Sequence, residues 1–194
     1  MGFAVDTSFV AWAISFFTLL GDIFLALLLA HFIWISILKK KSPEFVAPVK
    51  KVILANSLAF AFLVALAATL GSLFMSEVAH YPVCSLCWVQ RVFMYPQALL
   101  LGAALFANYR KLAALSIPMS VLGGMISVYQ YSEQRFAETG QQLGSLSVCS
   151  ATGPSCASTP FLYFGYITIP LMAVTAFALI ICFVLISRGY DGKN

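Results

Sequence analysis

The chain has 194 residues, of which 61% are apolar and 9% are charged, and its formal net charge is +4. Soluble domains carry about a quarter charged residues, so this composition excludes a protein surrounded by water and indicates a lipid environment. The length excludes a sizeable soluble domain, and the scattered lysines and arginines exclude the basic patch of a nucleic-acid-binding protein.

Five apolar segments are each long enough to cross a bilayer as a helix, which requires roughly 20 residues. Within a helix the backbone polar groups are satisfied internally. The predicted fold class is therefore all-α, an integral membrane helical bundle. In chain order the segments cover residues 9–38, 52–75, 87–107, 112–131 and 161–186.

The first segment has the pattern of a retained membrane helix. A cleaved signal peptide has a basic start and an apolar core of about 7 to 15 residues, whereas here Asp6 precedes a longer run and the lysines follow it. Asp22 lies inside this run, where an ionised carboxylate is costly. We interpret Asp22 as a hydrogen-bonded packing residue, with a role in proton relay as the alternative.

The positions of the positive residues predict the orientation of the five spans. Nine of the 11 lysines and arginines fall between the first and second spans, between the third and fourth, or after the fifth. These three positions share one face, which the positive-inside rule assigns to the cytoplasm. The N-terminus is therefore predicted outside, and the long polar stretch 132–160 connects the last two spans on the outer face.

Four of the five cysteines fall on this predicted outer face, where an oxidising compartment allows disulfides to persist. Cys84 and Cys87 form a CxxC pair at the start of the third span, where helix dipoles favour thiolate. Cys149 and Cys156 enclose six residues of a polar loop, and an exposed disulfide of this kind is typically labile. Cys182 lies near the cytoplasmic end of the last span and is interpreted as an apolar filler.

Arg91 follows Cys87 by four residues, so it lies one helical turn along the same face. A permanent cation favours thiolate beside it, and an arginine at a membrane edge requires an anionic or electron-rich partner such as a thiolate or a reduced quinone. The alternative is an arginine that extends to the lipid headgroups, with Trp88 and Tyr95 as interfacial aromatic residues.

Two cysteine pairs on one face, one fixed at the membrane edge and one in a mobile loop, indicate an electron relay. The loop pair would collect electrons from a soluble dithiol and pass them to the CxxC pair. The final acceptor must then lie in the lipid, and the sequence has no haem or flavin motif. A lipid-soluble quinone is therefore the simplest predicted oxidant.

Residues 84–91 read Cys-Ser-Leu-Cys-Trp-Val-Gln-Arg, with Leu-Gly-Ser-Leu at 70–73 and Ser-Glu at 76–77 before them and Met-Tyr-Pro at 94–96 after them. The second cysteine pair is followed by Phe-Gly-Tyr-Ile-Thr-Ile-Pro-Leu at 164–171. These motifs resemble the DsbB family of disulfide-bond formation proteins, especially its BdbC-like branch. The resemblance covers about residues 63–186.

The resemblance implies a membrane thiol:quinone oxidoreductase that reoxidises a thioredoxin-like, DsbA-type thiol oxidase. By this resemblance the partner attacks the Cys149–Cys156 disulfide at Cys149, and Cys156 then exchanges with the Cys84–Cys87 pair. Cys87 would pass electrons to ubiquinone or menaquinone, while Arg91 stabilises the thiolate and the reduced ring. The implied location is the bacterial cytoplasmic (inner) membrane, multi-pass, with both cysteine pairs on the extracytoplasmic face.

The predicted organisation is a four-helix DsbB-like core with one extra helix. Residues 1–51 would form the additional N-terminal helix and a basic cytoplasmic loop. Residues 52–194 would form the four-helix membrane domain, with outer loops 76–86 and 132–160. Relatives commonly have four spans, so the extra helix has no assigned role. Some relatives place a histidine near the quinone after the fourth span, where this chain has Glu133 and Gln134.

Three other functions are alternatives to this one. A vitamin K epoxide reductase-like enzyme also couples loop cysteines to a quinone, but its CxxC follows the loop pair, and here it precedes. A structural zinc site could use the four outer cysteines, but their spacing does not match zinc knuckles and the compartment favours oxidation, so no metal is predicted. A conduit carrying electrons outward needs a cysteine pair on the cytoplasmic side, near which only Cys182 lies.

Overall fold

The structure is a computed structural model that describes residues 7–38, 47–107, 109–140 and 155–191. The regular secondary structure of these residues is helical, and the one β-type pairing among them is an isolated bridge between Tyr163 and Ile167. Five of the helices are long and apolar enough to cross a membrane. This confirms the predicted all-α bundle with five spans, whereas the orientation of the N-terminus stays a prediction.

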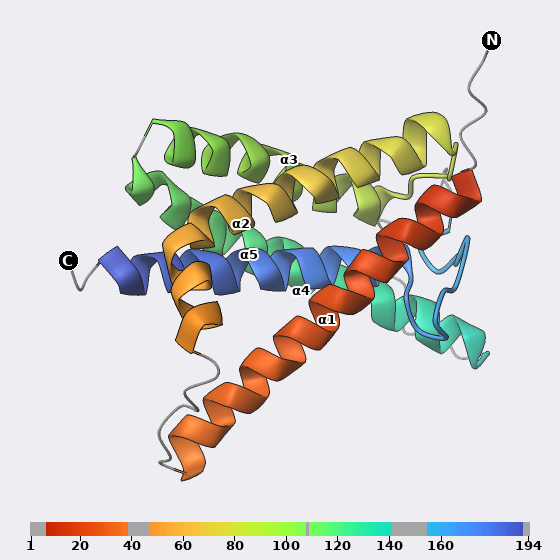
Figure 1. Cartoon of the computed structure of the whole chain (residues 1–194). Helices are drawn as coiled ribbons and strands as arrows, with labels where there is room; N and C mark the ends of the chain where they lie inside the picture. Colours follow the sequence, from red (N-terminus) through yellow and green to blue (C-terminus); the bar gives the residue numbers. More distant parts are fainter. Residues whose placement is uncertain (1–6, 39–46, 108, 141–154, 192–194) are drawn as a thin grey trace.

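Two short helical turns accompany the five long helices (Figure 1). A π-helical turn, η2, continues the second helix, and a 3-10 turn, η3, precedes the fourth. The elements in chain order are α1 (Thr7–Leu38), α2 (Ala47–Leu73), η2 (Phe74–Val78), α3 (Ser85–Phe106), η3 (Arg110–Leu115), α4 (Ser116–Glu138) and α5 (Ile169–Asp191).

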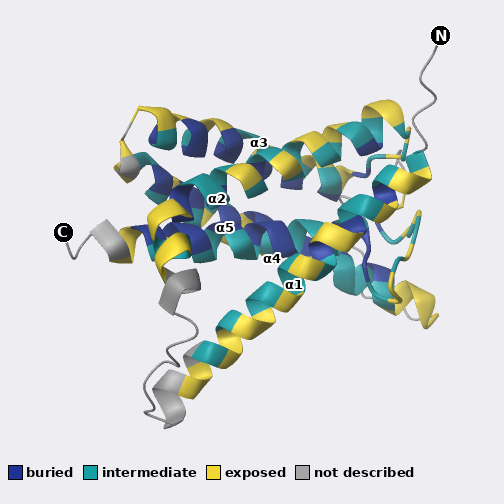
Figure 2. Cartoon of the chain, viewed as in Figure 1, coloured by how far each residue is buried: buried dark blue, intermediate teal, exposed yellow. Residues whose placement is uncertain are grey.

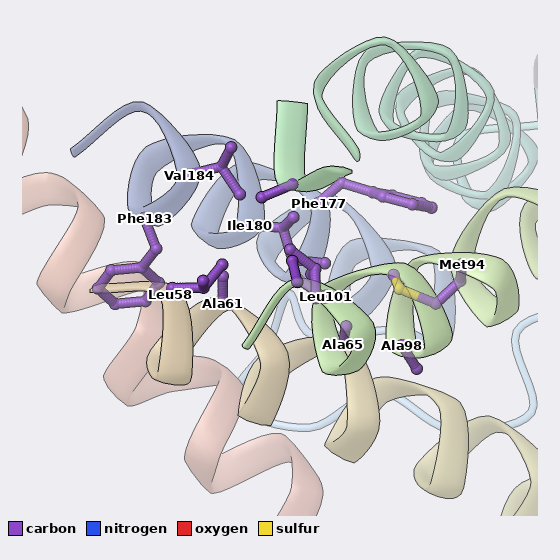
Figure 3. Close-up of a cluster of buried hydrophobic side chains, with 13 residues drawn as sticks. Leu58, Ala61, Ala65, Met94, Ala98, Leu101, Phe177, Ile180, Phe183 and Val184 are labelled. Carbon is purple, nitrogen blue, oxygen red and sulfur yellow. The ribbon is translucent and has the colours of Figure 1, made fainter. Parts of the chain in front are cut away.

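Helices α2, α3, α4 and α5 form a four-helix bundle, in which α2 packs on α3 and α5, and α4 packs on α3 and α5. Its core is a cluster of buried apolar side chains (Figure 3), and Gly123 of α4 approaches Phe177 of α5 so closely that a Cβ atom would overlap the ring. The labelled members come from α2 (Leu58, Ala61, Ala65), α3 (Met94, Ala98, Leu101) and α5 (Phe177, Ile180, Phe183, Val184).

Helix α1 crosses the outside of this bundle obliquely and contacts α5 (Figure 1). Most of its surface is exposed or only partly buried (Figure 2), as expected of a helix that faces lipid. The carboxylate of Asp22 accepts hydrogen bonds from Thr175 Oγ1 at 2.6 Å and from the Tyr166 hydroxyl at 3.1 Å. These contacts favour the interpretation of Asp22 as a hydrogen-bonded packing residue.

Several helix ends differ from the predicted bounds, and the differences are largest at the end of α4 and the start of α5. Helix α4 continues past residue 131 to Glu138, because the polar residues of its last turns find partners: Tyr129 donates to Glu133 at 3.1 Å, and Arg135 pairs with Glu138 at 2.8 Å. Helix α5 begins at Ile169 instead of residue 161. Proline is well tolerated in a first helical turn, and Pro170 occupies that position.

Candidate active site

The CxxC pair lies where the sequence predicts it, at the start of α3. Cys84 is the N-cap, and its Sγ accepts a hydrogen bond from the backbone N–H of Cys87 at 3.3 Å. The two Sγ atoms are 2.7 Å apart, and neither cysteine is in a disulfide. The hydrogen bond with Cys87, followed by burial, raises the pKa of the Cys84 thiol above its ordinary value. The reduced pair therefore holds Cys84 as a neutral thiol.

Gln130 of α4 is a third member of this site, and it is only 2% exposed. Its Nε2 donates to Cys84 Sγ at 3.1 Å and to Cys87 Sγ at 3.4 Å, while its Oε1 accepts from Gln90 Nε2 at 2.7 Å. The sequence alone does not predict this role for Gln130. It has no local signal, because a glutamine in a helix of mixed polarity is ordinary and its partners are 43 and 46 positions away.

Replacing Gln130 by Leu is expected to make the reduced Cys84–Cys87 pair less stable relative to its disulfide. Both sulfurs lose a donor, and the hydrogen bond to a thiolate at Cys87, as to other charged groups, contributes about 1.5–3 kcal/mol, so the dithiol–disulfide equilibrium constant changes roughly tenfold or more. Titration against a glutathione redox buffer measures it. Gln97→Leu is the control, because Gln97 is equally buried on α3 but bonds Ser120 instead. Equal constants in both variants would contradict this role of Gln130.

Arg91 points into the protein from α3, with only 8% of its surface exposed. Its Nε donates to Ser72 Oγ and its Nη2 to the Ser72 carbonyl oxygen, both at 3.1 Å. Tyr95 also donates to Ser72 Oγ, at 3.3 Å, and the Arg91 Cζ lies 5.0 Å from the centroid of the Trp88 ring. This geometry disfavours an arginine extended to the headgroups. Within the described part of the chain no carboxylate forms an ion pair with Arg91.

A cavity of about 310 Å³ adjoins this site, a volume within the usual range of ligand pockets. Cys87, Gln90 and Arg91 lie on its wall together with Ser72 and Tyr95. Most of the remaining wall is apolar and comes from α1, α2, α3 and α5, including Val64, Ala67, Ala68, Met94, Met172, Ala173, Ala176, Phe177 and Leu179. A mainly apolar cavity with a few polar groups gathered beside a cysteine is suited to an apolar ligand that carries a few polar atoms.

Glu133 and Gln134, which occupy the position that holds a histidine in some relatives, do not line this cavity. Glu133 accepts from Tyr129, and the buried Gln134 donates to the Ser158 carbonyl oxygen at 2.9 Å. Gln134 therefore fixes the following loop against α4. The helices that line the cavity are instead α1, α2, α3 and α5.

Cys156 is disulfide-bonded and 3% exposed, and it packs in one buried cluster with Cys84 and Leu86. The structure thus brings one cysteine of the predicted loop pair to the CxxC pair. Cys149 lies outside the described residues. Cys182 is about 20 Å along α5 from its start at Ile169, by the rise of an α-helix, and takes no part in this cluster.

Comparison with known proteins gives consistent matches. Residues 55–187 match the family described as "Disulfide bond formation protein DsbB". A "Probable disulfide formation protein" of Coxiella burnetii (strain RSA 493 / Nine Mile phase I) is 43% identical over 135 residues, which are 70% of this chain and 88% of the relative. "Disulfide bond formation protein C" of Bacillus subtilis (strain 168) is 38% identical over 128 residues, 66% of this chain and 89% of the relative.

No solved structure shows a significant match to the chain. The family match covers α3, α4 and most of α2 and α5, and it begins after α1 has ended. The matched region contains all the cysteines of the CxxC and loop pairs, and the relatives are named for the same process. The chain therefore belongs to the DsbB family of disulfide bond formation proteins.

Proposed function

We propose that this DsbB-family protein is a membrane thiol:quinone oxidoreductase that reoxidises a thioredoxin-like, DsbA-type thiol oxidase outside the bacterial cytoplasmic membrane. The observation that carries this proposal is the position of Cys87 and Arg91 together on the wall of a mainly apolar cavity. A cavity of this kind is suited to an acceptor that arrives through lipid, which ubiquinone and menaquinone do. Residues 52–194 are the catalytic domain in this proposal.

The first half of the reaction is thiol–disulfide exchange. A thiolate of the partner attacks the Cys149–Cys156 disulfide at Cys149, and the partner's second thiol displaces Cys149, so the partner is oxidised and the loop pair is reduced. Cys156 then attacks the Cys84–Cys87 disulfide, and Cys149 closes on Cys156 to regenerate the loop disulfide. Burial of Cys156 and Cys84 in one cluster supports this second exchange.

The second half returns the CxxC pair to its disulfide. Joining Cys84 and Cys87 releases two electrons and two protons, which convert a quinone to its quinol. Cys87 is the cysteine on the cavity wall, and Gln130 donates to its sulfur. The Arg91 guanidinium supplies positive charge on the same wall, where negative charge develops on the thiolate and on the reduced ring.

A double variant, Cys149→Ser with Cys156→Ser, separates the two halves. We expect it to lose quinone reduction driven by a reduced DsbA-type oxidase, because the protein partner delivers its electrons to the loop pair. Reduction driven by dithiothreitol should persist, since a small dithiol reaches the partly buried Cys87 directly. Both rates are followed by quinone absorbance, with Cys182→Ser as the control. Undiminished turnover with the protein partner would show that the loop pair is not its entry point.

A further inference from the structure

Helix α1 presents a narrow face of small and polar residues to the bundle. Ala11, Ser15 and Thr18 are buried, and their spacing of four and three positions places them on one side of the helix. The hydroxyls are satisfied within the helix, since Ser15 donates to the Ala11 carbonyl oxygen at 2.8 Å and Thr18 to that of Ile14 at 2.9 Å. Small residues of this kind allow close helix packing in lipid.

The same side of α1 is fixed to its neighbours at the level of Asp22. Burial raises the pKa of Tyr166, and the nearby Asp22 raises it further, so the phenol stays protonated and donates to Asp22. Thr175 of α5 supplies the second bond to this carboxylate. At Gly21 a Cβ atom would lie only 3.1 Å from the side chains of Thr175 and Leu179, so α1 and α5 approach closely here.

Helix α1 also reaches the cavity of the redox site. Ile14, Phe17 and Thr18 are part of the wall that includes Cys87 and Arg91. The contacts between α1 and α5 lie beside this wall, because Thr175 and Leu179 of α5 also line the cavity. Gly71 of α2 lines the cavity beside Ile14, whose Cδ1 would lie 3.5 Å from a Cβ atom at Gly71. Phe17 is 70% exposed, which places it where the cavity meets the lipid-facing surface.

We propose that α1 is the lipid-side wall of the quinone site, that Ile14, Phe17 and Thr18 contact the bound quinone, and that Asp22 is the residue that positions this wall. This inference rests on the proposed function, because it assigns the cavity to a quinone. It gives a role to a helix that precedes the region matched by the family, residues 55–187. The contacts of α1 would then affect how tightly the quinone binds, whereas thiol–disulfide exchange would depend on residues of α3.

Photolabelling of the full-length protein with an azido-substituted ubiquinone tests the contact without measuring turnover. We expect label on the peptide that contains residues 14–18 as well as on α3, and we expect excess unlabelled ubiquinone, but not excess phospholipid, to suppress both. Label on α3 that ubiquinone suppresses, with no suppressible label on α1, would overturn this inference and leave the proposed function standing. Absence of suppressible label anywhere would overturn both.

Steady-state kinetics gives a second readout. Thr18→Leu adds bulk to the cavity wall, and we expect it to raise KM for quinone about tenfold with kcat little changed. Ala26→Leu, at an exposed position further along the same helix and outside the cavity wall, is the matched control and should leave KM unchanged. Unchanged KM in Thr18→Leu, in a protein that reduces quinone, would overturn the assignment of this wall.

The positioning role of Asp22 has its own pair of variants. Asp22→Ala removes the acceptor for Thr175 and Tyr166 and is expected to raise KM for quinone in the same way. Asp22→Asn keeps an acceptor oxygen and is expected to restore a KM close to that of the wild type. Identical KM values in Asp22→Ala and in the wild type would contradict the positioning role.

Discussion

Replacing Cys87 by Ser is expected to reduce quinone turnover to the background rate. Cys87 is the member of the CxxC pair on the cavity wall, and a serine hydroxyl can neither close a disulfide with Cys84 nor pass electrons on. The measurement is quinone absorbance during turnover by the purified protein in detergent, driven by a reduced thioredoxin-like oxidase. The loss should be complete for either quinone.

Cys182→Ser is the matched control for this variant. Cys182 is a thiol of the same chemistry within α5, outside the cluster that holds Cys84 and Cys156, and its replacement should leave the turnover rate unchanged. Turnover by Cys87→Ser at the wild-type rate would show that electrons leave the protein elsewhere. An equal loss in both variants would point to damage to the fold in place of a specific redox role.

Replacing Arg91 by Ala is expected to lower kcat/KM for quinone about 100-fold, the usual scale for removing a preorganised charged donor from a site where negative charge develops. The disulfides should still form, because no step of thiol exchange between the cysteine pairs requires the guanidinium. Thiol counting on the oxidised variant checks this second expectation. Arg91→Lys keeps the charge but loses the two-point contact with Ser72, so an intermediate rate is expected.

Arg135→Ala is the control for the loss of positive charge. Arg135 lies on α4 in a surface ion pair with Glu138 at 2.8 Å, and surface pairs of this kind contribute little to stability. We expect its quinone kinetics to match the wild type. Full quinone turnover by Arg91→Ala would show that the assigned role of Arg91 is wrong.

The membrane fold follows from local properties of the sequence. Runs of apolar residues indicate spans independently of the rest of the chain, so all five helices could be predicted. The end of α4 could not be found from the apolar run alone, because polar side chains such as Glu133 and Arg135 extend the helix beyond its apolar residues through contacts within the same helix. Cys84 is the N-cap of α3, in agreement with the prediction that the CxxC motif lies at the start of this span. This prediction is possible because the motif is local in the sequence.

The site was only partly predictable for a related reason. Cys84, Cys87 and Arg91 share one helix, so their spacing alone places them together. Gln130 reaches the cysteines only because α3 and α4 pack against each other, and that register is not encoded in either segment alone. The sequence indicates that an ionised carboxylate at Asp22 is costly in lipid. Its hydrogen-bond partners on α5 and in the preceding loop appear only in the fold.

The most direct test of the relay counts the quinols that form when the fully reduced protein is oxidised once. The full-length protein is reduced completely, freed of reductant and mixed with excess quinone in detergent. Each disulfide that forms releases two electrons, so two reduced pairs connected in series should yield two quinols per chain. The Cys149→Ser, Cys156→Ser double variant should yield one. A single quinol from the wild type would contradict a relay between the two pairs, and none with either ubiquinone or menaquinone would contradict quinone reduction itself.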